Sequence, residues 1–258
     1  MVLNKATLAS MASYQMSCFI LPKETTKKID ALQKDFWWGK ETNYKGYYPV
    51  SYSCLCKPKI KGGLGFRNAQ RYNLAIIAKL AWRLLTEPTA LWVSQLKPRY
   101  FRKSSVFKDK IPTTSSWIWK CISKGIILVE QNNIWETGDG SSTNIWDDNW
   151  IPNLENNLSS YKTASNSHLT LVKDMFEPIT MKWNYTLLIE MFPVAIANKI
   201  NNVRIAKGKS DTLRWLLTKS GRFTVKSMYN KLTEKTRNHY NLGQPDSFWN
   251  SLWKLNVS

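Results

Sequence analysis

The residues best suited to chemistry lie in the segment CKPKIKGGLGFR at residues 56–67, where a glycine turn carries several cations. Glycine has no side chain, so Gly62, Gly63 and Gly65 would let the backbone approach a phosphate closely. Backbone amides of the helix expected next would point at that anion. The cations of the segment are Lys57, Lys59, Lys61 and Arg67. The alternative is a tight solvated turn, because GGLG matches neither G-x-x-x-x-G-K-[ST] nor G-x-G-x-x-G.

A helix over residues 68–86 is expected to follow this turn. Asn68 is a suitable N-cap, and Glu87-Pro88 stops the helix. Its apolar face is broad, so we expect the helix to be buried on more than one side. The cations expected to remain exposed along it are Arg71, Lys79 and Arg83.

Two further helices are expected in the first 40 residues, one over residues 4–20 and one after Pro22. In the second, Ile29, Leu32 and Phe36 recur at three- and four-residue steps and predict an apolar face. Its opposite, lysine-rich face is either solvated or laid along a nucleic-acid backbone. The pair Trp37-Trp38 fits core packing, or stacking on bases as in single-strand binders.

The region around residues 91–116 predicts a short helix near Leu91 to Leu96 that Pro98 ends early. Basic and aromatic residues then alternate over 97–110, which fits a groove for a single strand or a solvated loop. Ser115 or Ser116 is a suitable cap for a short helix that starts near residue 117.

The pattern changes to strands from Ile134. Segments 134–137 and 143–146 flank Asp139-Gly140 and predict a hairpin. A second hairpin is expected between 212–217 and 222–225, followed by a helix from about Lys226. The fold class is therefore α+β, with a mainly helical N-terminal half and β-hairpins in the C-terminal half. The expected domains are 1–130, a helical segment with a basic surface; 131–152, a Trp-rich hairpin; 153–168, a polar linker; and 169–258, a small α+β segment.

Seven segments, in this order and spacing, resemble one known family: FWWGK (36–40), CKPKIKGGLGFRN (56–68), YNLAIIAKLAWRLLTEP (72–88), SSWIWKCI (115–122), IWETGDGSSTNIWDDNWIP (134–152), SGRFTVKSMYNKL (220–232) and FWNSLWKLNV (248–257). They are similar to a plant LINE-type non-LTR retrotransposon reverse-transcriptase polyprotein. The resemblance covers the region from just after the polymerase palm, through the thumb, to the start of a zinc-binding module. It implies a thumb-like segment that holds template and primer.

By that resemblance the nucleic-acid-binding candidates are Lys57, Lys59, Lys61, Gly62, Gly63, Gly65, Arg67, Arg71, Lys79 and Arg83. Polymerisation in the family needs an aromatic-x-Asp-Asp turn in the palm, whose carboxylates hold two magnesium ions. Asp147-Asp148 lies well downstream, where the family has no catalytic aspartates, so we expect no catalytic residue and no enzyme activity. The apolar residues near the end, in 248–258, are expected to be exposed because in the family they pack on the zinc module.

Metal and cofactor sites are not expected. The four cysteines form no C-x2-C pair, and both histidines stand far from them in sequence, so Cys54 and Cys56 are ordinary thiols. The start of the chain has no continuous apolar run that would span a bilayer and makes a poor signal peptide. A nuclear or cytoplasmic location is therefore expected, with no membrane partner and no small-molecule substrate.

The charge favours a polyanionic partner. Lys and Arg number 37 against 18 Asp and Glu, a net charge of +19. Residues 1–110 hold 20 basic and 6 acidic side chains, and residues 111–258 hold 17 and 12. Such a field attracts RNA or DNA but supplies no sequence preference. The expected function is non-catalytic binding of nucleic-acid backbone; the alternatives are a protein-interaction module, with a palm-containing reverse transcriptase as partner, or an unselected retroelement remnant.

Overall fold

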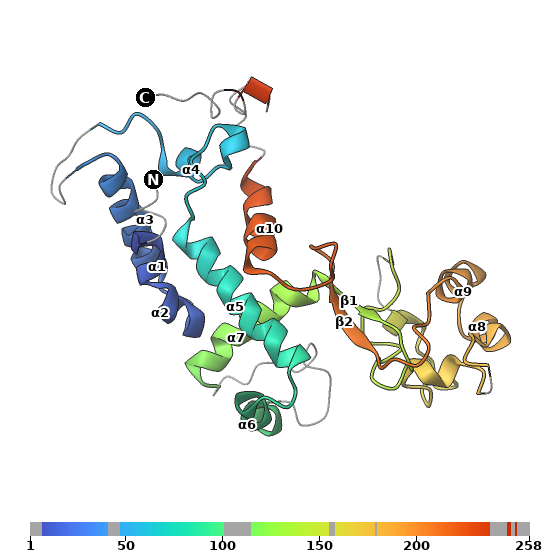
Figure 1. The fold of residues 1–258 in the computed structure, drawn as a ribbon. Helices are drawn as coiled ribbons and strands as arrows, with labels where there is room; N and C mark the ends of the chain where they lie inside the picture. Colours follow the sequence, from blue (N-terminus) through green and yellow to red (C-terminus); the bar gives the residue numbers. More distant parts are fainter. Residues whose placement is uncertain are drawn as a thin grey trace. The chain divides into compact units, whose positions relative to one another are not determined.

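The computed structural model describes residues 7–40, 47–100, 115–154, 158–178, 180–237, 247–248 and 251. The chain forms two compact units (Figure 1). Unit 1 comprises Met1–Leu84, Ile111–Leu128 and Thr224–Ser258, and unit 2 comprises Leu85–Lys110 and Val129–Phe223. The predicted α+β, mostly helical fold class is confirmed, since a single two-stranded sheet accompanies the helices of the described residues.

Unit 1 is built from helices that come from three separate stretches of sequence. In chain order they are α1 (Ala9–Met11), α2 (Ser13–Cys18), α3 (Lys23–Trp37), α4 (Tyr52–Leu55), the 3-10 turn η2 (Lys59–Lys61), α5 (Ala69–Thr86), α7 (Trp117–Glu130) and α10 (Val225–Arg237). The helices predicted after Pro22 and over residues 68–86 are present, whereas the one predicted over 4–20 is divided into α1 and α2. Helix α7 is longer than the short helix we expected, and its start is capped by Ser116, whose Oγ accepts from Trp119 N at 3.3 Å.

Helix α5 is the centre of unit 1, and it is buried on more than one side as predicted. Its Asn68 cap accepts from Arg71 N at 3.1 Å. Asn73 is buried and donates to the carbonyls of Met16 and Phe19 at 2.8 and 2.7 Å, which fixes the end of α2 against α5. Farther along α5, a Cβ at Gly125 of α7 would lie 2.8 Å from Ile77 O, so this glycine permits close helix packing. Ala75 and Ala78, which the helical repeat places on the opposite face from Asn73, are also fully buried.

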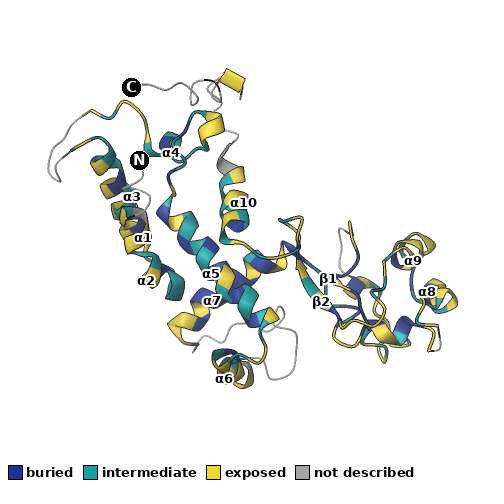
Figure 2. Ribbon diagram, viewed as in Figure 1, coloured by how far each residue is buried: buried dark blue, intermediate teal, exposed yellow. Residues whose placement is uncertain are grey.

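Helix α3 carries buried, half-buried and exposed residues (Figure 2), and its buried positions do not follow its apolar pattern. We expected its apolar stripe to face the core, but Leu32 and Phe36 are 52% and 47% exposed. The buried positions are instead the polar residues Thr26 and Gln33. Gln33 is buried because its side chain has a hydrogen-bonding partner on the inner face of α3: its Oε1 accepts from Tyr52 Oη at 3.1 Å. An apolar stripe with this exposure lacks a cover among the described residues.

Unit 2 begins with helix α6 (Leu91–Tyr100), which contains Pro98. The prediction that Pro98 ends this helix early is wrong. The interleaved basic and aromatic stretch predicted beyond it lies mostly in 101–114, outside the described residues, as does nearly all of 248–258. The remaining elements are the 3-10 turns η3 (Leu158–Tyr161) and η4 (Val172–Met175), the helices α8 (Tyr185–Met191) and α9 (Val194–Asn201), and two strands.

The strands pair differently from the two predicted hairpins. Strand β1 (Asn133–Glu136) pairs antiparallel with β2 (Thr212–Trp215), with Asn133 opposite Trp215 and Glu136 opposite Thr212. Both strand positions were therefore predicted, but each was assigned the wrong partner. Segment 143–146 contributes an isolated bridge between Asn144 and Leu171, and residues 222–224 are not a strand.

The loop expected to be a hairpin turn, residues 138–143, instead surrounds the carboxylate of Asp211. Asp211 Oδ1 accepts from the amides of Gly138 and Gly140 at 2.7 and 2.9 Å. Its Oδ2 accepts from Ser142 N at 2.9 Å and from the amide and hydroxyl of Thr143 at 3.0 and 2.9 Å. The Asp211 side chain is 8% exposed and accepts from five donors. These hydrogen bonds outweigh the local preference of Asp-Gly for a two-residue turn.

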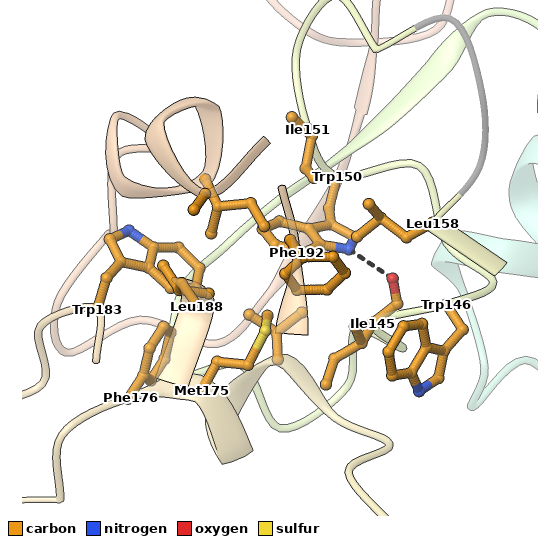
Figure 3. Packing of buried hydrophobic residues seen from close by; sticks show 13 residues of the cluster. Ile145, Trp146, Trp150, Ile151, Leu158, Met175, Phe176, Trp183, Leu188 and Phe192 are labelled. Carbon is orange, nitrogen blue, oxygen red and sulfur yellow. Dashed lines mark hydrogen bonds between the residues drawn. The ribbon is translucent and has the colours of Figure 1, made fainter. Parts of the chain in front are cut away.

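The core of unit 2 is a cluster of aromatic and aliphatic side chains (Figure 3). Trp150 stacks on Trp183 at 5.6 Å between ring centroids and donates its indole N–H to Ile145 O at 3.1 Å. Leu158 belongs to the same cluster at 3% exposure. The linker and domain boundary predicted at 153–168 thus fall inside unit 2. The polar composition of that stretch did not indicate that its leucine is buried.

Candidate nucleic-acid interface

The backbone amides of the glycine turn are hydrogen-bonded to carbonyls of the same turn. The amides of Gly62, Gly63 and Gly65 donate to the carbonyls of Lys59, Pro58 and Lys57 at 3.0, 3.1 and 2.8 Å. Gly62 and Gly65 have φ of +73° and +66°, a region that favours glycine. Since all three amides are used inside the turn, they do not form the phosphate cradle that the sequence allowed. The glycines shape the turn, and the side chains around it remain as candidate contacts.

The start of α5 is likewise occupied by protein groups. Ala69 N donates to Asp30 Oδ1 at 2.8 Å, and Asn68 Nδ2 donates to Asp30 Oδ2 at 2.6 Å. The amide of Asn68 donates to Tyr229 Oη at 2.9 Å. Asp30 of α3 therefore takes the place at the positive end of the helix where an anion was expected. Burial raises the pKa of the Asp30 carboxyl to about 6, against the opposing effect of the Ala69 hydrogen bond.

A pocket of about 450 Å³ lies beside the turn, wholly within unit 1. It brings together the glycine turn, the start of α5 and the first turns of α10, which are far apart in sequence. Four cations are among its lining residues: Lys57, Arg67, Arg71 and Lys226. None of the described residues that line it is an Asp or a Glu. The pocket therefore favours anions.

The lining of the pocket also includes aromatic side chains. The rings of Tyr72 and Tyr229 meet edge to face with centroids 6.4 Å apart, and the Arg67 guanidinium lies 4.7 Å from the Tyr72 centroid. Phe66, also in the lining, is 1% exposed. Burial raises the pKa of the Cys56 thiol and of the Tyr229 hydroxyl, each to about 12. Both groups are therefore neutral at physiological pH and do not repel an anion.

The predicted site residues divide into two sets. Lys57, Gly65, Arg67 and Arg71 line the pocket. Lys59 and Lys61 are exposed on η2, Gly62 and Gly63 shape the turn beside it, Lys79 is exposed farther along α5, and Arg83 is half-buried. Tyr72, Lys226 and Tyr229 also line the pocket and were not predicted. The last two lie on α10, about 160 residues beyond the turn, and no local pattern indicates that contact.

The other candidate residues have structural surroundings. Trp37 packs edge to face on the buried Phe66 at 5.5 Å between centroids, which is core packing rather than an open stacking platform. Asp148 Oδ2 accepts from Asn144 N at 2.7 Å within its own turn. Over the described ranges, no group of three or more His, Cys, Asp or Glu side chains could hold a metal ion. No helix in the described part of the chain has the length and apolarity to cross a membrane.

Comparison with known proteins gives two relatives, both from Arabidopsis thaliana. The protein named "Putative ribonuclease H protein At1g65750" is 31% identical over 268 aligned positions, which cover 100% of this chain and 42% of the relative. The "Uncharacterized mitochondrial protein AtMg00310" is 37% identical over 139 positions, which cover 54% of this chain and 90% of the relative. No family model and no solved structure matches the chain.

The chain belongs to the same protein family as the mitochondrial protein AtMg00310, which it covers almost completely. It spans less than half the length of the ribonuclease H relative. Both relatives are plant proteins, which agrees with the plant family that the sequence resembles.

Proposed function

We propose that the chain is a non-catalytic region of a LINE-type reverse-transcriptase polyprotein, the region that follows the palm, and that it binds nucleic-acid backbone without sequence preference. The observation that carries this proposal is the distribution of charge between the units. Unit 1 holds 21 basic and 6 acidic residues, a net charge of +15 out of the total of +19, whereas unit 2 holds 16 and 12. A nuclear or cytoplasmic location is part of the proposal.

The geometry supports this function because the cations of unit 1 are accessible. Lys59, Lys61, Arg67 and Lys79 are exposed. Three of the four belong to the glycine turn and η2, next to the anion-favouring pocket. Cations that contact phosphates release condensed counterions, so affinity depends steeply on salt but weakly on sequence. The name of the first relative, a ribonuclease H protein, fits a setting in which RNA is present.

Filter binding of single-stranded RNA and of duplex DNA across a salt series tests the proposal. About six phosphate contacts predict a log–log salt slope of roughly five on duplex DNA. The double variant Lys61→Gln, Lys79→Gln removes two exposed cations of unit 1 and is expected to lower that slope by about two. The matched control is Lys182→Gln, Lys219→Gln, two exposed lysines of unit 2, which should leave the slope unchanged. Failure to retain either polymer at low salt would refute the proposal.

A second candidate function is a protein-interaction module, and the exposed stripe of α3 is the observation that favours it. Leu32 and Phe36 are one helical turn apart and about half exposed, an arrangement typical of a docking face. The proposed partner is a palm-containing reverse transcriptase. Co-elution of the chain with such a fragment in size exclusion is expected, and Leu32→Ser, Phe36→Ser should abolish it. Ile127→Ser, another exposed apolar position of unit 1, is the control. A strict monomer that ignores the palm fragment would count against this function.

A further inference from the structure

The pocket beside the glycine turn has more structure than binding of a phosphate backbone requires. A backbone contact needs exposed charge alone, as Lys59 and Lys61 provide on η2. The pocket instead combines its cations with aromatic side chains in one lining. Its volume of about 450 Å³ lies within the range of roughly 300–1,000 Å³ that is usual for small-molecule sites.

The cations stand around the aromatic rings. Arg67 lies over the ring of Tyr72, and the Tyr72 ring meets that of Tyr229 edge to face. An arginine guanidinium plane and a tyrosine ring are the two surfaces on which proteins stack unpaired bases. Lys57, Arg71 and Lys226 supply positive charge in the same lining, which suits the phosphate of a nucleotide.

The pocket also lacks groups that would reject such a ligand. No described lining residue carries a carboxylate. Burial raises the pKa of Cys56 and of Tyr229, which extends the pH range over which these two lining groups stay neutral. An apolar ligand would not use the positive charge of the lining, and inorganic phosphate would not use its aromatic side chains.

We propose that this pocket takes one nucleoside monophosphate unit, with the base against Tyr72 and Arg67 and the phosphate at Lys57, Arg71 and Lys226. This inference rests on the proposed function, because the natural source of the bound unit would be an unpaired nucleotide of a bound strand. A free mononucleotide has the same chemistry. The pocket would then give a protein without sequence preference a preference for unpaired over paired nucleotides.

Isothermal titration of the full chain at low salt tests the pocket directly, with AMP, UMP, adenosine and inorganic phosphate as probes. AMP and UMP are expected to bind saturably with one site, at least about tenfold more tightly than adenosine or phosphate. Asn230→Trp should abolish this binding, because residue 230 lines the pocket and is exposed, so the new ring fills the pocket without changing its charge. Gln15→Trp makes the same replacement at an exposed helix position outside the lining and should bind as the wild type does.

The results separate this inference from the proposed function. Absence of saturable AMP and UMP binding, or equal affinity for inorganic phosphate, overturns the pocket assignment even if polymers bind with the expected salt slope. AMP binding without binding of any polymer supports the pocket, with a free nucleotide as its ligand, and refutes the proposed function. Competition of AMP by a short single-stranded RNA, but not by a duplex of equal length, supports the unpaired strand as the source.

Discussion

Asp211→Ala is expected to lower the free energy of unfolding of unit 2 by about 3–5 kcal/mol, because it leaves a set of buried donors without an acceptor. Four backbone amides and the Thr143 hydroxyl donate to this one carboxylate. Asp211→Asn should cost nearly as much, since its amide group turns a donor toward other donors. Native-state hydrogen exchange followed by mass spectrometry measures the effect within unit 2 alone, which matters in a chain of two units.

Asp139→Ala is the matched control for this prediction. It makes the same chemical change in the same loop, but Asp139 is more exposed, and its carboxylate accepts from the amide and hydroxyl of Ser141. Those hydrogen bonds lower the pKa of the Asp139 carboxyl. The control should disturb exchange locally. Equal effects of the two variants would show that Asp211 does not organise the loop.

Gly63→Ala is expected to destabilise unit 1 by roughly 2–3 kcal/mol, because the turn has no room for a methyl group. A Cβ at residue 63 would lie 2.1 Å from Lys57 O. That carbonyl also accepts from Gly65 N at 2.8 Å, so any movement to relieve the clash opens the turn. The change should appear as faster hydrogen exchange across η2 and the start of α5.

Gly39→Ala separates the clash from backbone strain alone. Gly39 has a φ of +60° but nothing within 4 Å of an added Cβ, so its cost should be about 1 kcal/mol. If Gly63→Ala weakened binding of RNA but left hydrogen exchange unchanged, the turn would be a ligand loop and the structural role described above would be wrong. The expected result is loss of stability, with binding lost only as far as the unit unfolds.

The sequence was sufficient to predict the elements that depend on local signals. Helix α5 has the Asn68 cap and the apolar breadth that predicted it, and β1 and β2 lie where strands were expected. The polar side chains Thr26 and Gln33 show where local pattern fails: an apolar period predicts which residues share a face, but the neighbour decides which face is covered. In α3 that neighbour presents hydrogen-bonding partners.

Long-range contacts account for the rest of the differences. Strand β1 meets β2 rather than the segment after Asp139-Gly140, because the Asp211 carboxylate holds that loop open from 68 to 73 residues away in sequence. The candidate site was found in part, from the cations of the glycine turn. The aromatic side chains of the site were not predicted, since Tyr229 contacts the turn through packing and through its hydrogen bond to the amide of Asn68.

The Asp211 contact also bears on the chemical ageing of the protein. Asp-Gly is the dipeptide in which an aspartate most readily isomerises, through attack of the following amide nitrogen on the side-chain carboxyl carbon. In the folded chain the amide of Gly140 donates to Asp211 Oδ1 at 2.9 Å, and the Asp139 carboxylate accepts a hydrogen bond from the Ser141 hydroxyl. The amide nitrogen and the carboxylate are thus both engaged in other hydrogen bonds while unit 2 is folded. A carboxylate that shapes a loop thereby protects the neighbouring backbone from slow covalent damage.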